Sequence, residues 1–262
     1  MSIKIGFTER GDAGRDLSWY DKCLAGKCDG AIVITKSLTP ECRERLLRLH
    51  KAGFPVVLHC GCTGWGGTYM EPNVPGLHVQ LHSLKELLRD GFPLRNVVLR
   101  VDPIIPTDEG LMRAQSVLNS ALSIGILPSG CRVRISVVDM YRHVNTRFAM
   151  AKITSPYGDA FAPSQNCLKY VRSALGVFHY RDGIVFETCA EPALYNLNTE
   201  MFVQRGCISK TDLDIMGLSY DKESTNPQGR SGCLCLGCKV ELLENKHRCP
   251  NGCLYCYWRD KN

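Results

Sequence analysis

Three cysteines near the end of the chain, Cys249, Cys253 and Cys256, have a spacing suited to metal chemistry. They form the pattern C-x3-C-x2-C within the sequence Arg-Cys-Pro-Asn-Gly-Cys-Leu-Tyr-Cys-Tyr. Three thiolates on one short loop can ligate three irons of a [4Fe–4S] cluster, whose complete ligand set is four cysteines. The missing ligand leaves one iron open to bind a substrate or cofactor. Gly252 permits the sharp turn that lets the sulfurs converge.

A zinc site is the competing interpretation of the same region. Cys235-x2-Cys238 is followed after fourteen residues by Cys253-x2-Cys256, which is close to the spacing of a four-cysteine zinc ribbon. Such a site would be closed and structural, and it would leave Cys233 and Cys249 without a role. We expect an iron–sulfur cluster and keep Zn²⁺ as the alternative occupant.

The number and distribution of cysteines favour metal binding over disulfides. Six of the fifteen cysteines fall between Cys233 and Cys256, and an odd count cannot be fully paired. A chain of 262 residues needs no disulfides to fold, and its first ten residues show no secretory signal. We therefore expect a reducing, cytoplasmic compartment.

Charge and hydropathy restrict the partners only loosely. The net charge of +6 suits an anionic substrate, a phosphorylated cofactor or nucleic acid. No run approaches the roughly 18 apolar residues of a transmembrane helix, so we expect no membrane partner.

Six nearly continuous apolar runs predict the buried strands of a parallel sheet. They span residues 3–8, 31–35, 55–59, 96–101, 132–138 and 184–188. Predicted helices alternate with them at residues 16–25, 40–52, 83–90, 108–124 and 163–175. This α/β pattern predicts a parallel, partial (β/α)6 TIM-like barrel, with a doubly wound open sheet as the alternative. Two further strands for a full barrel are not evident.

The pattern changes after Glu191. Residues 192–206 and 211–216 have helical character, and residues 221–232 are polar and typical of a linker. We expect two parts, a partial βα barrel over residues 1–191 and a helical, cysteine-rich iron–sulfur tail over residues 192–262 that packs on it.

Charged residues at the carboxyl ends of the predicted strands are candidate catalytic groups, because parallel βα folds carry their sites at that edge. They are Arg10, Lys36, Arg100, Asp102 and Glu187. The three cations would bind anionic groups. The alternative is that these strand ends are merely solvated.

A glycine-rich loop follows the third predicted strand, over residues 61–67. Glycine lets the backbone approach a ligand closely, so Gly64, Gly66 and Gly67 are candidate cofactor-binding residues. A plain turn is an equal alternative. The loop matches neither the dinucleotide-binding nor the phosphate-binding glycine motif.

Residues 249–257 resemble the cluster loop of radical-SAM enzymes, closest in style to that of spore photoproduct lyase. In that superfamily the three cysteines normally follow the first barrel strand, whereas here they stand near the C-terminus. The resemblance implies that Cys249, Cys253 and Cys256 bind a [4Fe–4S] cluster whose open iron binds S-adenosylmethionine. The glycine-rich loop would hold the methionine part, and Tyr255 would cover the cluster or stack on adenine, or simply pack.

The whole chain also resembles an uncharacterised bacterial family of unknown function, whose cysteine triad lies at its C-terminus. The matching stretches are residues 35–36, 63–75, 100–104, 137–141, 187–191 and 228–235. This resemblance implies an auxiliary [4Fe–4S] cluster held by Cys189, Cys207, Cys233 and Cys235. The alternative is that Cys189 and Cys207 are plain buried cysteines.

Reductive cleavage of S-adenosylmethionine is the function that the first resemblance implies. It would yield methionine and a 5′-deoxyadenosyl radical that takes a hydrogen atom from an unknown substrate, with an electron donor such as a flavodoxin or ferredoxin as partner. A second hypothesis applies the same chemistry to a nucleotide or nucleic-acid base, although no helix-turn-helix or concentrated basic run supports it. A third is a non-catalytic α/β protein with a zinc-ribbon tail.

Overall fold

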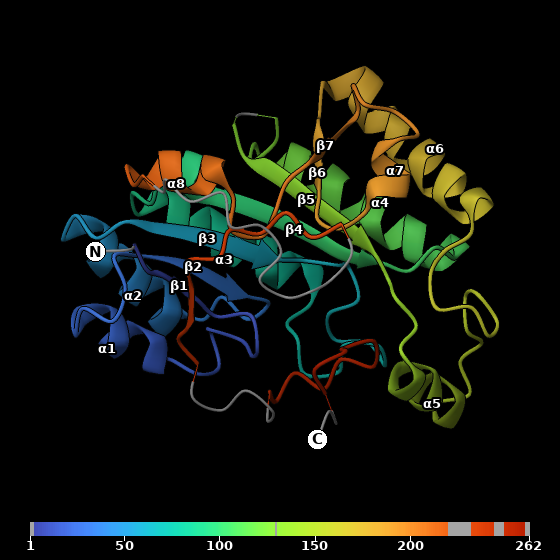
Figure 1. The fold of residues 1–262 in the computed structure, drawn as a ribbon, viewed down its shortest axis with the longest axis horizontal. Coiled ribbons are helices and arrows are strands. Elements are labelled where there is room, and N and C mark those ends of the chain that lie inside the picture. The colour runs from blue at the N-terminus through green and yellow to red at the C-terminus, as the bar shows by residue number, and fades with distance from the viewer. Residues whose placement is uncertain (1–2, 129, 220–231, 244–248, 260–262) are drawn as a thin grey trace.

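The computed structural model describes residues 3–128, 130–219, 232–243 and 249–259. Within these ranges the chain forms one all-parallel, eight-stranded sheet in the order β7-β6-β5-β4-β3-β2-β1-β8 (Figure 1). The strands are β1 (Ile5–Phe7), β2 (Gly30–Thr35), β3 (Val56–Gly61), β4 (Val97–Ile104), β5 (Arg132–Val137), β6 (Phe186–Thr188), β7 (Phe202–Gln204) and β8 (Lys239–Glu241). The predicted parallel α/β class is confirmed, with all six predicted strands present.

Eight α-helices accompany the sheet in the described part of the chain. They are α1 (Ser18–Leu24), α2 (Pro40–Lys51), α3 (Leu77–Arg89), α4 (Asp108–Ser123), α5 (Arg142–Met150), α6 (Gln165–Asp182), α7 (Pro192–Tyr195) and α8 (Lys210–Met216). The predicted polar linker lies, except for Gly232, outside the described residues.

The two faces of the sheet are covered differently, because successive side chains of a strand point to opposite faces. Val33, Leu58 and Leu99 pack in the larger core with apolar residues of α1–α4 and α6. Their neighbours Ile32 and Val98 pack in a second core with α8 and with cysteines from the loops. Burial on both faces explains why the central strands read as continuous apolar runs.

Helix boundaries follow the local sequence in part. The side chain of Thr39 accepts a hydrogen bond from the backbone of Cys42 and caps α2, as the sequence indicates. The helix predicted to begin at Ser83 instead begins at Leu77, because Leu77, Leu81 and Leu84 already continue its apolar stripe.

The prediction of one helix over residues 192–206 is wrong. After the four residues of α7 the chain turns and forms β7, which pairs with β6. Phe202 is fully buried, and its ring centroid lies 6.2 Å from that of Phe186. Tertiary packing therefore overrides the helical character of this short segment.

The count of six strands is also corrected, since β7 and β8 extend the sheet at its two edges. β8 reads Lys-Val-Glu and is partly exposed throughout, so it lacks the apolar run that marks a buried strand. Short, charged edge strands of this kind are common. The segment after residue 191 thus contributes strands to the same sheet as the segment before it.

The two edges approach each other just beyond β7 and just before β8. The backbone N–H of Leu236 donates to the carbonyl of Ile208 (3.0 Å). In the described residues no ladder joins β7 to β8, so the sheet is described as eight parallel strands and not as a closed barrel. None of the described helices is long and apolar enough to cross a membrane.

Candidate metal and cofactor site

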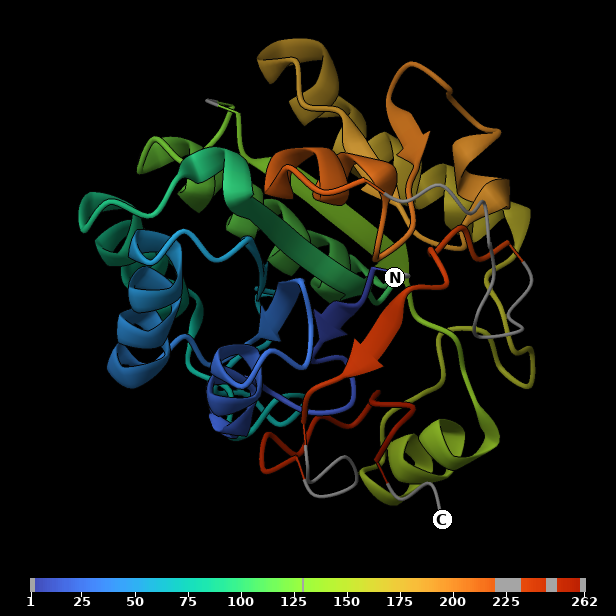
Figure 2. The same cartoon turned by 60° about the vertical axis from the view of Figure 1, so that its left-hand side comes forward.

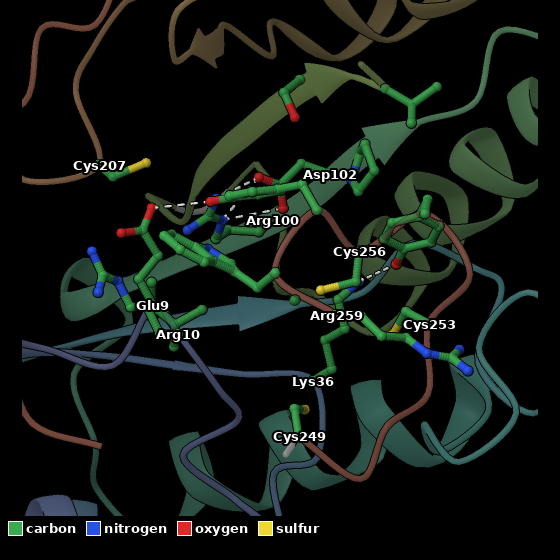
Figure 3. A pocket seen from close by; sticks show the side chains of 18 of the residues that line it. Glu9, Arg10, Lys36, Arg100, Asp102, Cys207, Cys249, Cys253, Cys256 and Arg259 are labelled. Carbon is green, nitrogen blue, oxygen red and sulfur yellow. Dashed lines mark hydrogen bonds and ion pairs between the residues drawn. The ribbon is translucent and has the colours of Figure 1, made fainter. Parts of the chain in front are cut away.

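A cavity of about 530 Å³ lies at the carboxyl ends of the central strands. Its volume falls in the range of about 300–1,000 Å³ that is usual for small-molecule sites. Its walls come from the carboxyl end of β4, the segments after β1, β2, β5, β6 and β7, the segment before β8, and residues 249–259. The side chains of Arg10, Lys36, Arg100 and Asp102 line it, as do those of both groups of candidate metal ligands (Figure 3).

Cys249, Cys253 and Cys256 line one side of this cavity. Figure 3 shows them on one side of the Arg100–Asp102 pair, with Cys207 on the other. Their three sulfurs do not all lie within 4.8 Å of one another. Among the described residues, the cysteines that lie this close together are Cys189, Cys207 and Cys235.

Asn251 anchors the first part of this loop to the sheet. It is buried, and its amide donates to the carboxylate of Asp12 (2.6 Å). Asp12 also accepts from the hydroxyl of Thr35 (2.6 Å) and from the backbone of Lys36 (2.8 Å). One buried carboxylate therefore fixes the loop against the ends of β1 and β2.

Helix α5 anchors the rest of the loop through Arg147. Its guanidinium donates to the carbonyl oxygens of Leu254 (2.8 Å), Cys256 (2.5 Å) and Arg259 (3.0 Å). A ring nitrogen of His143 lies 3.0 Å from the carbonyl oxygen of Tyr257. Figure 1 shows α5 beside the C-terminal segment.

Burial controls the protonation of two of the three thiols. It raises the pKa of Cys249 to about 11 and that of Cys253 to about 12. Both are therefore protonated at neutral pH in the metal-free protein, and binding a metal must release these protons.

A second group of cysteines, Cys189, Cys207 and Cys235, has sulfur atoms that all lie within 4.8 Å of one another. The thiol of Cys207 lies 3.4 Å from the sulfur of Cys189, and the backbone N–H of Cys207 donates to the sulfur of Cys235 (3.1 Å). Hydrogen bonds from Cys189 and Cys207 lower the pKa of Cys235 to about 4. The group could hold a metal ion.

The other two cysteines of this region lie outside that group. Cys233 is buried and lines the same cavity. Cys238 is buried immediately before β8, and its carbonyl accepts a hydrogen bond from the backbone N–H of Ile5 (2.7 Å). Cys235 thus lies with Cys189 and Cys207, and not in the ribbon-like set of Cys235, Cys238, Cys253 and Cys256.

Lys36, which is partly buried, forms a hydrogen-bonded triad with the buried residues Glu71 and Tyr255. Its ammonium lies 2.7 Å from the carboxylate of Glu71 and 2.6 Å from the hydroxyl of Tyr255, which itself donates to Glu71. Burial alone would lower the pKa of Lys36, but the negative charge of Glu71 raises it above its ordinary value. Tyr255 is thus held by protein contacts next to Cys253 and Cys256.

The other candidate cations differ in how their charge is balanced. Arg100 forms a forked pair with Asp102, with nitrogen–oxygen distances of 2.5 to 3.1 Å. Arg10 lies over the ring of Trp258 at 4.5 Å from its centroid and has no carboxylate partner among the described residues. Arg10 is therefore the better candidate for binding an anionic ligand.

Glu187, the remaining candidate catalytic residue, does not line this cavity. Its buried carboxylate pairs with Arg134 (2.7 Å) and Arg205 (3.0 Å). It belongs to a network of ion pairs between residues of neighbouring strands and of α8. This network also contains the pair of Asp212 and Arg132 (2.5 Å). This placement favours a structural role.

None of the three candidate glycines, Gly64, Gly66 and Gly67, lines the cavity. The glycine of this loop that does line it is Gly61. A Cβ on Gly66 would lie 2.0 Å from the carbonyl of Pro75, and Gly67 donates to the carbonyl of Glu71 (3.1 Å). Residues 64–67 therefore position Glu71, and through it Lys36, without lining the cavity themselves.

Sequence reasoning missed four residues that build the site, namely Asp12, Glu71, Asn251 and Arg147. Asp12 and Glu71 stand beside motifs that the sequence does reveal, the first strand end and the glycine-rich loop. Arg147 lies on α5, which the sequence analysis did not predict, and no local signal links it to residues 100 positions later.

Comparison with known proteins supports the predicted resemblance to a family of unknown function. No curated protein matches the chain. One family model matches residues 19–258, which include both cysteine groups and Lys36, Arg100 and Asp102, whereas Arg10 precedes the match. Since the match spans most of the sequence, the chain belongs to the family described as a domain of unknown function, DUF1848.

Proposed function

We propose that this protein is an iron–sulfur enzyme of the radical-SAM type, with its cluster on Cys249, Cys253 and Cys256. The observation that supports this most strongly is the position of these cysteines, which line a cavity of about 530 Å³ at the carboxyl ends of parallel strands. That edge is where parallel βα folds generally carry their active sites.

The donor set fits a cluster with an open iron. Thiolates are the preferred ligands of iron–sulfur clusters, and three of them leave one iron without a protein ligand. The sulfurs are not gathered as closely as those of the other cysteine group, which suits ligands of separate irons better than ligands of one ion. When bound, such a cluster supplies an electron for the reductive cleavage of S-adenosylmethionine.

The protein's own contribution is to hold and enclose the reactants. The loop is fixed on both sides, by Asp12 and by Arg147, so its three cysteines are held in position before the cluster binds. The Lys36–Glu71–Tyr255 triad fixes the wall next to them. Arg10 would bind an anionic group of a ligand, such as a carboxylate.

Anaerobic reconstitution with iron and sulfide tests this proposal. The wild type should take up about four irons in the loop, and with dithionite and S-adenosylmethionine it should release 5′-deoxyadenosine. Cys253→Ala should lose both properties. Cys167→Ala is the matched control, because Cys167 lies on α6 outside the cavity lining.

Two outcomes would contradict the proposal. One is a cluster-loaded wild type that yields no 5′-deoxyadenosine, and the other is an equal yield from Cys253→Ala. The auxiliary cluster on Cys189, Cys207, Cys233 and Cys235, which the family resemblance implies, would raise the iron content to about eight per chain. Iron content therefore also measures whether a second cluster is present.

A further inference from the structure

The sulfurs of Cys189, Cys207 and Cys235 come together from three distant parts of the chain. Cys189 follows β6, Cys207 follows β7, and Cys235 precedes β8. All three line the cavity, and their sulfurs lie within 4.8 Å of one another. Local sequence does not impose such a convergence, so it must come from the fold.

The spacing of these sulfurs suits one metal ion. A tetrahedral ion with metal–sulfur bonds of about 2.3 Å places its sulfur ligands about 3.8 Å apart. The Cys189 and Cys207 sulfurs are 3.4 Å apart. In a [4Fe–4S] cluster each cysteine binds a different iron, so the cysteine sulfurs must lie farther apart than the sulfurs around one ion. Hydrogen bonds connect all three thiols in the metal-free protein, and the same close spacing suits the ligands of one tetrahedral ion.

The surroundings suit a negatively charged, thiolate-rich centre. The backbone N–H of Cys207 donates to the sulfur of Cys235, and such bonds stabilise thiolate ligands. Arg134 is fully buried, and its Nε and one Nη have no hydrogen-bond partner among the described residues. Burial opposes the charges of Arg134 and Arg100, and their pKa values are raised mainly by Glu187 and Asp102 respectively. Electrostatic interaction with Cys207 adds to both shifts, so two guanidinium charges lie near the group.

The group lies where the two edges of the sheet meet. Residues 206–208 follow β7, residues 234–236 precede β8, and the two segments are joined by the Leu236–Ile208 hydrogen bond. A Cβ on Gly206 would lie 2.5 Å from the carbonyl oxygen of Leu234 and 2.7 Å from the Cα of Cys235, so only glycine permits this approach. Figure 2 shows β8 at the edge of the sheet.

We propose that Cys189, Cys207 and Cys235 bind a single divalent, thiophilic ion such as Zn²⁺, which fastens the two edges of the sheet together. Cys233 lies outside the group, so the fourth coordination position belongs to a ligand from the cavity, such as water. An open position of this kind distinguishes reactive zinc sites from closed structural ones. The proposal does not depend on the function of the Cys249–Cys256 loop.

The test uses the full chain in which Cys249, Cys253 and Cys256 are all replaced by Ala, so that the other group is examined alone. After addition of Zn²⁺ and desalting, this parent should retain about one zinc per chain, and a strong chelator should lower its Tm. Adding Cys207→Ala or Cys235→Ala should abolish both effects. Adding Cys233→Ala or Cys238→Ala should preserve them.

The folded wild type provides a measurement that does not depend on these variants folding. Bound zinc should protect Cys189, Cys207 and Cys235 from alkylation, and chelation should expose them, as read by mass spectrometry of the peptides.

Three results would overturn the proposal. They are an iron–sulfur chromophore with about four irons in the triple-alanine parent, loss of zinc from Cys233→Ala as complete as from Cys207→Ala, and absence of zinc-dependent protection in the wild type. A failure to form 5′-deoxyadenosine leaves all of these measurements unaffected, so the two proposals can fail separately.

Discussion

At the scale of single residues, charge in this protein is balanced mostly by specific partners. Lys36 and Arg100 look alike as cations at strand ends, and the structure pairs the first with Glu71 and the second with Asp102. Arg10, which has the same sequence signature, faces an aromatic ring. Binding of an external anion is therefore expected at Arg10 before the other two.

His59 is an ionisable residue that lacks such a close partner in the described part of the chain and is therefore neutral in the folded protein. It is fully buried on β3, its ring nitrogens have no hydrogen-bond partner among the described residues, and its nearest ionic neighbour is Asp212 at 3.9 Å. Burial lowers its pKa to about 4. The folded state thus resists protonation of a residue that the unfolded chain protonates near pH 6.5.

Stability should therefore fall in mild acid through His59. Between pH 6.5 and about 4 the unfolded state binds a proton that the folded state does not, so the free energy of unfolding decreases as the pH falls. The decrease due to this residue should be about 3 kcal/mol at pH 4 relative to pH 7. Urea denaturation at both pH values should show that His59→Gln has lost this part of the pH dependence.

The exposed residue His78 on α3 supplies the control. His78→Gln should keep the full pH dependence of the wild type. Equal pH dependence in His59→Gln and the wild type would contradict the assignment.

At the scale of elements, α5 serves the site although it contributes none of the candidate ligands. Its buried face packs through Val144 and Phe148 into a small core that includes Cys253 and Tyr255. Arg147 then binds three successive parts of the loop backbone. The helix therefore supports residues 253–259 through both apolar contacts and hydrogen bonds.

Removing Arg147 should loosen the loop and leave the sheet intact. In Arg147→Met, the carbonyls of Leu254, Cys256 and Arg259 lose their common donor, and each lost hydrogen bond to a charged group contributes about 1.5–3 kcal/mol. Hydrogen exchange followed by mass spectrometry should show faster exchange in the peptide containing residues 249–259. Cluster content after reconstitution should fall.

Arg142→Met is the matched control, because Arg142 is exposed on the same helix. Its exchange rates in that peptide should equal those of the wild type. Unchanged exchange in Arg147→Met would show that the loop is held by other contacts.

At the scale of the whole molecule, residues from both sides of position 191 build one sheet. β7 and β8 flank the six strands of the first segment, and each pairs with a strand of that segment. The second core likewise combines Ile5 and Phe7 with Leu213 and Met216. These contacts predict that the two segments unfold together.

Tryptophan fluorescence can test this prediction. The three tryptophans are Trp19, Trp65 and Trp258, so the variant Trp19→Phe/Trp65→Phe leaves a reporter in the last segment alone. Its fluorescence midpoint in urea should coincide with the midpoint from far-ultraviolet circular dichroism, which reports on the whole fold. A lower midpoint for Trp258 would instead indicate that the last segment unfolds separately.

The sequence by itself determined the α/β class, the six central strands and the residues with reactive side chains. It could do so because strands buried on both faces need continuous apolar runs, and because thiols and strand-end charges are visible as residue types. Lys36, Arg100 and all seven predicted metal-binding cysteines illustrate this, since they line one cavity.

Only the tertiary structure decided which of these residues act together. β8 is too short and polar to be recognised before its pairing with β1 is known, and β7 is stabilised by packing against β6. Glu187 carries the same signature as Asp102, yet it lies in a separate ion network because Arg134 on β5 and Arg205 after β7 neutralise it there. The convergence of Cys189, Cys207 and Cys235 depends on contacts between distant segments, which no local pattern encodes.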